Sequence, residues 1–128
     1  MEELLQVISD YSRIPMDELR EKTRVQRIIY YQFIFCYLAL DQKIASAPDI
    51  SRKLGRFDHS FARRSRRKIK EWLSYDKNLA RDIQAIESTY YYRDRALIVR
   101  DLIGQMTWQQ LSEIIDYAKS MGLETKAF

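Results

Sequence analysis

Hydrophobic residues recur along this chain of 128 residues at the three- and four-residue spacing of amphipathic helices. Leu4, Leu5 and Ile8 share one face of the first such segment. Between residues 27 and 41, apolar side chains fall on nearly every helical bearing, which is typical of a helix at the centre of a bundle. The spacing predicts helices over residues 2–12, 15–21, 27–41, 47–54, 59–73, from 77 through Ile86, 95–103 and 107–121.

Capping residues mark the ends of these segments. Ser46 precedes Pro48 as an N-cap, and Gly55 stands where a helix ends in left-handed backbone. Asp58 is expected to cap the following helix, while Thr107 and Gly122 bound the last one. Three glycines and two prolines provide too few turns for a many-stranded sheet, so the predicted fold class is all-α.

A connection is expected around residues 90–95, where three tyrosines precede a short run of alternating charges. It divides the chain into a helical domain, residues 1–88, and a C-terminal helical extension, residues 89–128. The extension should hold a pair of helices with Gly104 between them.

Positive charge is concentrated in one stretch, although the net charge of the chain is only +4. Residues 52–70 hold nine Lys or Arg against the single acid Asp58, a local +8 that leaves −4 for the rest. A solvated helix face would mix both signs, so we favour a surface that binds a polyanion such as nucleic acid. Helical projection places Arg63, Arg64 and Arg67 opposite the apolar face of their segment.

A short helix, a tight turn and a longer helix with outward arginines form a helix-turn-helix, here residues 46–73. The second helix of this motif enters the major groove by its N-terminal end, so Asp58, His59 and Ser60 are the candidate base-reading residues. Their side chains can donate to or accept from base edges. Capped helix pairs also occur in bundles that do not bind DNA, so the pattern by itself leaves both interpretations open.

The segment Leu54-Gly55-Arg56-Phe57-Asp58-His59-Ser60-Phe61 resembles the Gly-Gly-Arg-Asp-His-Thr-Thr-Val signature of the DnaA family of bacterial chromosomal replication initiators. The resemblance continues without a gap from about residue 3 to residue 86, through Pro48-Asp49-Ile50 and Arg67-Lys68-Ile69. It concerns the C-terminal domain of that family, a Trp-repressor-like helical module that binds the DnaA box in duplex DNA.

The resemblance implies a role for each matched position. The family's base-reading triplet corresponds to Asp58, His59 and Ser60, and its minor-groove arginine corresponds to Arg24. Resemblance and basic charge together predict phosphate contacts at Lys22, Gln32, Arg56, Arg63, Arg64, Arg67 and Lys68.

Several positions depart from the family pattern. Phe57 replaces an arginine, Phe61 replaces a threonine, and Arg56 and Ser51 stand where glycine is usual. Gln32 and Arg64 occupy positions where the family has Arg and His. These departures leave the recognised DNA sequence open, while the mode of docking is expected to be the same.

Enzyme chemistry has no support in the sequence. The ATPase module of DnaA needs a Gly-x-x-x-x-Gly-Lys-Ser/Thr loop, which is absent here, so no nucleotide is expected. His59 and Cys36 are the single residues of their kinds and supply neither a nucleophile–base pair nor a metal site. Cys36 lies in an apolar helix and should be a buried, inert thiol. We therefore expect no catalysis, cofactor or metal.

Membrane insertion and export are also not expected. The longest apolar run, residues 28–40, would span ~20 Å as a helix, short of the ~30 Å of a bilayer core. The N-terminus begins with two acids, where a signal peptide would be basic. The expected location is the cytoplasm, in association with the nucleoid.

Two hypotheses of function remain. The first is sequence-specific binding of double-stranded DNA at a DnaA-box-like site, in replication initiation or its regulation. The second is a protein-interaction module that kept the fold and lost specific DNA reading. Trp108 and Tyr117 could anchor a partner protein or a second copy on residues 95–121, or could pack against the domain itself. RNA binding is disfavoured, because no aromatic-studded sheet is predicted.

Overall fold

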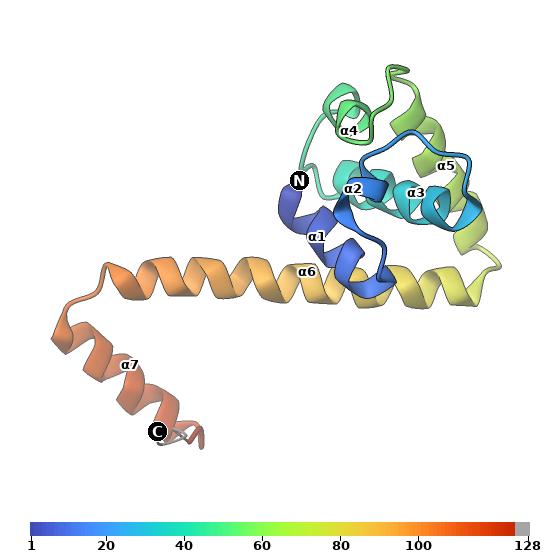
Figure 1. Ribbon diagram of the computed structural model, residues 1–128. Helices are drawn as coiled ribbons and strands as arrows, with labels where there is room; N and C mark the ends of the chain where they lie inside the picture. Colours follow the sequence, from blue (N-terminus) through green and yellow to red (C-terminus); the bar gives the residue numbers. More distant parts are fainter. Residues whose placement is uncertain (125–128) are drawn as a thin grey trace. The chain divides into compact units, whose positions relative to one another are not determined.

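The computed structural model describes residues 1–124, which form seven α-helices and no strand (Figure 1). This confirms the all-α fold predicted from the sequence. In chain order the helices are α1 (Glu2–Ser12), α2 (Met16–Leu19), α3 (Gln26–Asp41), α4 (Ala47–Lys53), α5 (Phe61–Leu73), α6 (Lys77–Gly104) and α7 (Trp108–Ser120).

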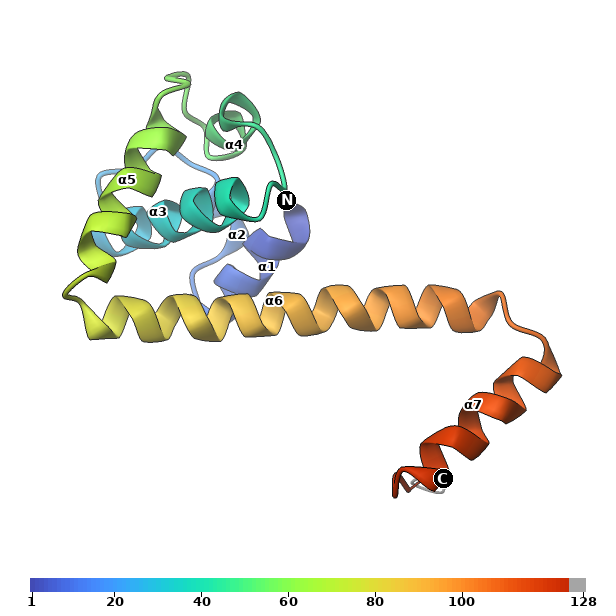
Figure 2. The same cartoon turned by 180° about the vertical axis from the view of Figure 1, so that it is seen from behind.

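The chain divides into two compact units, unit 1 (Met1–Tyr91) and unit 2 (Tyr92–Phe128). Figures 1 and 2 show α3 in the middle of unit 1, where it packs against α1, α2, α4 and α5. The buried Ile34, Phe35 and Leu38 put α3 at the centre of the core, as its apolar pattern predicted. Cys36 is also buried, and burial raises the pKa of its thiol to about 12, so it stays protonated and unreactive.

The first part of α6 belongs to unit 1 and is attached to its other helices by apolar packing and by one carboxylate. Leu79, Ile83 and Ile86 are buried, in agreement with the sequence-based expectation. The Tyr11 hydroxyl of α1 donates to Asp82 Oδ1 at 2.5 Å, and the Tyr30 hydroxyl of α3 donates to Oδ2 at 2.6 Å. One side chain of α6 therefore bonds to two other helices.

The connection predicted around residues 90–95 is wrong, because α6 is one continuous helix of 28 residues through that region. The physical reason is visible in the sequence: neither glycine nor proline stands between Gly55 and Gly104 to end a helix. Three adjacent tyrosines lower helix propensity only slightly. The division between the two units thus falls inside α6 and not in a loop.

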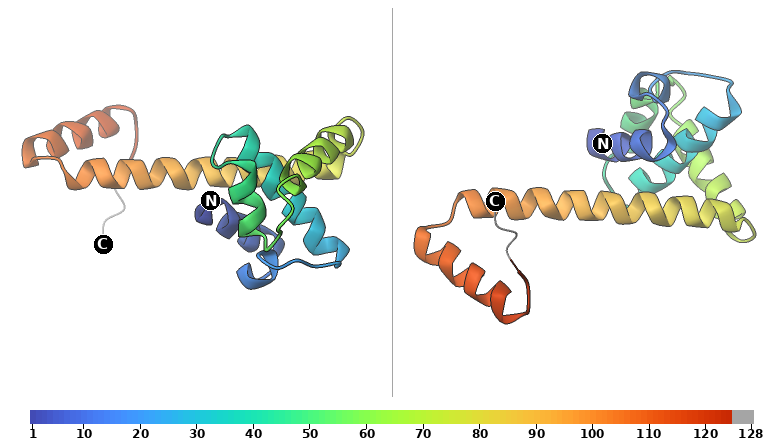
Figure 3. Two further views of the ribbon diagram at one scale, coloured as in Figure 1. Left: turned by 90° about the horizontal axis from the view of Figure 1, so that it is seen from above. Right: turned by 60° about the horizontal axis from the view of Figure 1, so that its bottom comes forward.

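Unit 2 contains the last turns of α6 and the whole of α7, which a short connection joins (Figure 3). Thr107 caps α7 as predicted, in a capping box with Gln110, and Gly122 has the expected positive φ of 85°. Between residues 92 and 124 no side chain is buried.

Candidate nucleic-acid interface

The predicted helix-turn-helix is formed by α4, α5 and the turn between them, which lies at the top of unit 1 in Figures 1 and 2. The Ser46 hydroxyl accepts from the Asp49 amide at 3.4 Å and starts α4 as expected. Ala62, Ser65 and Ile69 form the buried face of α5. The predicted amphipathic pattern of this helix is therefore confirmed.

Gly55 brings the turn against the basic loop between α2 and α3. Its φ of 70° lies in the left-handed region, as predicted for the residue after α4. A Cβ atom at this position would lie 2.8 Å from the Arg20 carbonyl oxygen and 3.3 Å from the Lys22 nitrogen. Only glycine allows both this backbone conformation and this close approach.

Arg56 does not reach outward, contrary to the phosphate contact predicted for it. Its Nη2 donates to the Thr23 carbonyl at 3.3 Å and to Gln32 Oε1 at 3.1 Å, and its guanidinium carbon lies 4.4 Å from the centre of the Phe61 ring. Half-buried between the loop, α3 and α5, it fixes their positions.

Gln32 is a second correction, because it is fully buried and its amide is used inside the domain. Its Nε2 donates to the Leu19 carbonyl at 3.1 Å and to the Glu21 carbonyl at 2.8 Å, while Oε1 accepts from Arg56. The resemblance implies a phosphate contact for Gln32, whereas its amide satisfies backbone carbonyls of the neighbouring loop.

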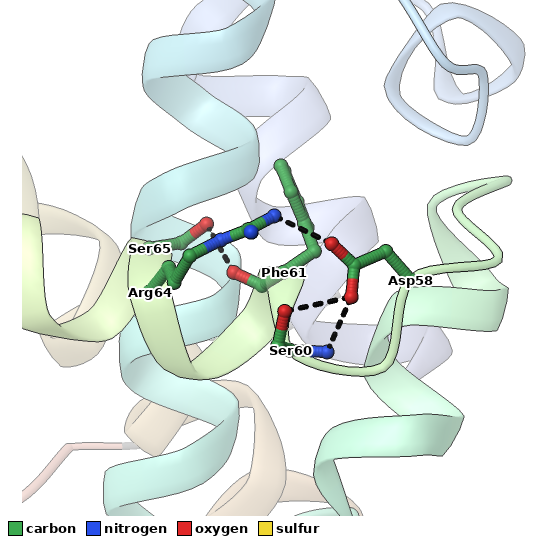
Figure 4. A network of polar contacts seen from close by, with 5 residues as sticks. All are labelled: Asp58, Ser60, Phe61, Arg64 and Ser65. Atoms are coloured by element: carbon green, nitrogen blue, oxygen red, sulfur yellow. Dashed lines mark hydrogen bonds and ion pairs between the residues drawn. The ribbon is translucent and has the colours of Figure 1, made fainter.

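Asp58 forms a local network with the start of α5 (Figure 4). Its Oδ1 accepts from the Ser60 amide at 2.9 Å and from the Ser60 hydroxyl at 2.7 Å, and its Oδ2 pairs with Arg64 Nη2 at 2.7 Å. The two bonds from Ser60, and then the Arg64 charge, hold the pKa of this exposed carboxyl below its usual range. Asp58 therefore stays ionised.

The start of α5 differs from the prediction by two residues. The helix begins at Phe61 with Ser60 as the N-cap residue, and Asp58 closes an Asx turn before it. The Phe61 amide donates to the Asp58 carbonyl at 3.1 Å, which completes the turn. His59, expected at the first helical position, lies in this turn and is exposed.

Five of the predicted contact residues are exposed cations that form no hydrogen bond or ion pair within residues 1–124. Two lie on the basic loop and three on α5: Lys22, Arg24, Arg63, Arg67 and Lys68. By contrast, Arg66 and Lys70 pair with Asp41 at the end of α3. Arg66 and Lys70 thus attach α5 to α3, whereas the three unpaired cations of α5 remain available to a ligand.

A hollow of about 340 Å³ lies between the loop and the helix-turn-helix, and its lining includes Lys22, Phe57 and Arg64. Phe57, which the sequence reasoning noted only as a departure, is 94% exposed. An aromatic side chain in a polar turn, directly before the candidate base-reading residues, was the signal that could have singled it out.

These elements define a helix-turn-helix DNA-binding module: a packed helix pair, an exposed turn with a polar triplet, and unpaired cations on the helix and the neighbouring loop. The chain belongs to the bacterial DnaA protein helix-turn-helix family, whose model matches residues 1–69.

Three chromosomal replication initiator proteins DnaA illustrate the relationship. The protein from Chloroflexus aggregans is 28% identical over 101 residues, covering 79% of this chain and 20% of the relative. That from Geobacter metallireducens is 31% identical over 86 residues, covering 67% and 19%. That from Enterococcus faecalis is 28% identical over 81 residues, covering 63% and 18%. The chain spans about a fifth of the length of these relatives.

No helix in the described part of the chain is long and apolar enough to cross a membrane. Residues 1–124 also contain no group of three or more His, Cys, Asp or Glu side chains placed to hold a metal ion.

Proposed function

We propose that this protein binds double-stranded DNA in a sequence-specific manner, at a site similar to the DnaA box. The observation that carries the proposal is the set of five exposed, unpaired cations that flank the exposed His59 turn. In the proposed complex α5 enters the major groove by its N-terminal end, and Arg24 enters the adjacent minor groove.

Phosphate binding and base reading fall to different residues. Arg63 and Arg67, one helical turn apart on the outward face of α5, contact phosphates together with Lys22 and Lys68. His59 reads a base edge, because its imidazole is exposed and has no partner within residues 1–124.

Asp58, Ser60 and Arg64 enter the proposed complex already bonded to one another. Asp58 can accept a hydrogen bond from a base through the lone pairs that these bonds leave unused. It can also do so after Arg64 leaves the carboxylate and moves to the DNA. We assign Arg64 to phosphate on exchange, and Ser60 to positioning the Asp58 carboxylate as well as to base contact.

Phe57 adds an apolar contact to this site. Its exposed ring directly precedes the triplet, and the methyl group of thymine is the apolar feature of the major groove. This contact shifts the preferred site away from that of relatives with arginine at this position.

The relatives are named as replication initiators, so we place the DNA binding in replication initiation or its regulation, at the nucleoid. The 128 residues hold no phosphate-binding loop, so in our proposal they supply DNA recognition and no ATP-driven step. An interaction module without DNA reading is the second candidate, favoured by the exposed apolar side chains of unit 2.

Duplex binding measured over a range of salt concentrations separates the two candidates. Four phosphate contacts and the Arg24 charge in the minor groove predict that log affinity falls with log salt with a slope of about −4 to −5. Arg67→Ala should flatten this slope by about one unit on every duplex. Arg81→Ala, which removes an exposed arginine from α6, should leave it unchanged. A wild-type slope shallower than about −1 would exclude duplex binding as the function.

A further inference from the structure

The described residues of unit 2, 92–124, have the apolar spacing of a helical core, but none of them is buried. Val99 and Ile103 of α6 are 53% and 42% exposed, and Trp108 and Ile115 of α7 are 87% and 47% exposed. Helices of this length are marginal in water unless an apolar face is covered, because ordering the chain costs conformational entropy. A stable fold of this unit therefore requires a partner surface.

The exposed residues follow the spacing of a helical bundle. On α6, Tyr92, Ala96, Val99 and Ile103 are separated by four, three and four residues, which is the spacing of a heptad seam. They line an open groove of about 520 Å³ whose edges are Arg95 and Arg100. Its apolar lining suits another amphipathic helix.

Helix α7 carries a matching apolar stripe. Trp108, Leu111, Ile115 and Ala118 are separated by three, four and three residues and lie on one face. The described unit thus holds a groove on one helix and a stripe that fits such a groove on the other. Two copies related by a twofold axis would satisfy both surfaces at once.

Charge favours a second copy over DNA or a lipid surface. Residues 92–124 contain four basic and five acidic side chains, a net charge of −1, whereas residues 52–70 carry +8. The polar face of α7 includes Glu113 and Asp116, while helices that lie on anionic membranes are rich in Lys and Arg. A nearly neutral surface does not repel its own copy.

Exposed apolar side chains occur on both helices of unit 2. Twelve large apolar residues between Tyr92 and Leu123 are 42–87% exposed. Exposed apolar patches on a single chain commonly mark an interface.

We propose that the protein is a homodimer in which unit 2 of each copy packs against unit 2 of the other. The stripe of α7 from one copy lies in the α6 groove of its partner, and the four helical segments form a bundle. The dimer brings together two helix-turn-helix modules. This second statement rests on the proposed DNA binding, whereas the dimer itself does not.

The mass of the full chain in solution, measured by light scattering after size exclusion, tests the dimer. At about 20 μM, wild type should have twice the 15.4 kDa of one chain. Val99→Asp places a charge in the buried seam and should weaken association roughly 100-fold or more. Leu97→Asp is a matched control, because Leu97 is 52% exposed and lies on the opposite face of α6. It should remain dimeric.

A single-chain mass for wild type overturns the proposal and assigns the surface to a different partner. A Val99→Asp variant that dissociates no more than Leu97→Asp overturns the placement of the seam. Binding to DNA with one site and with two sites is then compared. A dimer should bind the two-site duplex ~100-fold more tightly, and Val99→Asp should lose this gain while keeping one-site affinity. Loss of all DNA binding in an intact dimer would refute the proposed function and leave the dimer standing.

Discussion

Replacement of Gln32 distinguishes its two possible roles, buried hydrogen bonding behind the basic loop and the phosphate contact expected from the sequence. Replacement by leucine keeps the volume and the apolar surroundings but removes three hydrogen bonds, two to the Leu19 and Glu21 carbonyls and one to Arg56. Arg56 keeps its bond to the Thr23 carbonyl, so two carbonyls lose their partner. Each costs ~1–3 kcal/mol, and the apolar side chain regains ~1–2 kcal/mol.

The net expectation for Gln32→Leu is a loss of about 2–3 kcal/mol in the free energy of unfolding. For a domain of this size, 1 kcal/mol corresponds to ~4–8 °C in Tm, so the melting temperature should fall by roughly 10–20 °C. Thermal unfolding followed by circular dichroism at 222 nm measures this shift. DNA affinity at low temperature should fall as well, because the loop that carries Arg24 loses its attachment.

Gln26→Leu is the matched control, since Gln26 is exposed at the first turn of α3 and its replacement should change stability by less than ~0.5 kcal/mol. A phosphate contact would give the opposite result for Gln32→Leu. The variant would then melt within ~2 °C of wild type and bind duplex DNA more weakly, with an unchanged salt slope because glutamine carries no charge. That outcome would refute the buried role assigned to Gln32.

Three further predictions concern the boundaries and charges of unit 1. A truncation after Tyr91 should fold and bind a one-site duplex with wild-type affinity, and aggregation of the fragment would show that unit 2 belongs to the same core. Asp58→Asn should remove the ion pair that Arg64 gives up when it moves to phosphate, so binding should strengthen on every duplex and discrimination between sequences should fall; an unchanged affinity would argue against this exchange. The bond to Asp82 raises the pKa of Tyr11 to about 12, and a raised pKa means stability that is present below pH ~10 and lost above it. The excess stability of wild type over Tyr11→Phe should therefore shrink between pH 10 and 12, and a constant difference would contradict this cause.

Local patterns predicted most of the helices because the determining interactions are themselves local. Ser46, Gly55 and Thr107 act through their own backbone neighbourhood, so capping preferences located them correctly. The Asp58 cap was misplaced because an aspartate can close a turn or cap a helix with the same oxygens, and the sequence does not distinguish the two.

The errors at Gln32 and Arg56 have a different origin. Both side chains bond to backbone groups that are distant in sequence, at Leu19, Glu21 and Thr23. Periodicity reports which face of a helix a residue occupies but not which loop crosses that face. Family resemblance assigned Gln32 to DNA and basic charge assigned Arg56, whereas tertiary packing turns both side chains inward.

The same limit applies to the exposed cations. Arg63 and Arg67 differ from Arg66 and Lys70 only through Asp41, an acid at the end of another helix. A count of basic residues predicted the surface but not which of its charges are free.

Selection of bound duplexes from a random pool, performed in parallel on wild type, His59→Ala and Gln84→Ala, tests base reading by the α4–α5 turn most directly. Gln84 is an exposed residue of α6 and serves as the control. We expect wild type and Gln84→Ala to enrich one common motif. His59→Ala should lose preference at one position of it by ~1–3 kcal/mol while keeping the salt slope and melting temperature. If wild type enriches no motif, or if His59→Ala enriches the same motif as strongly, the turn does not read bases and the proposed sequence-specific function is wrong.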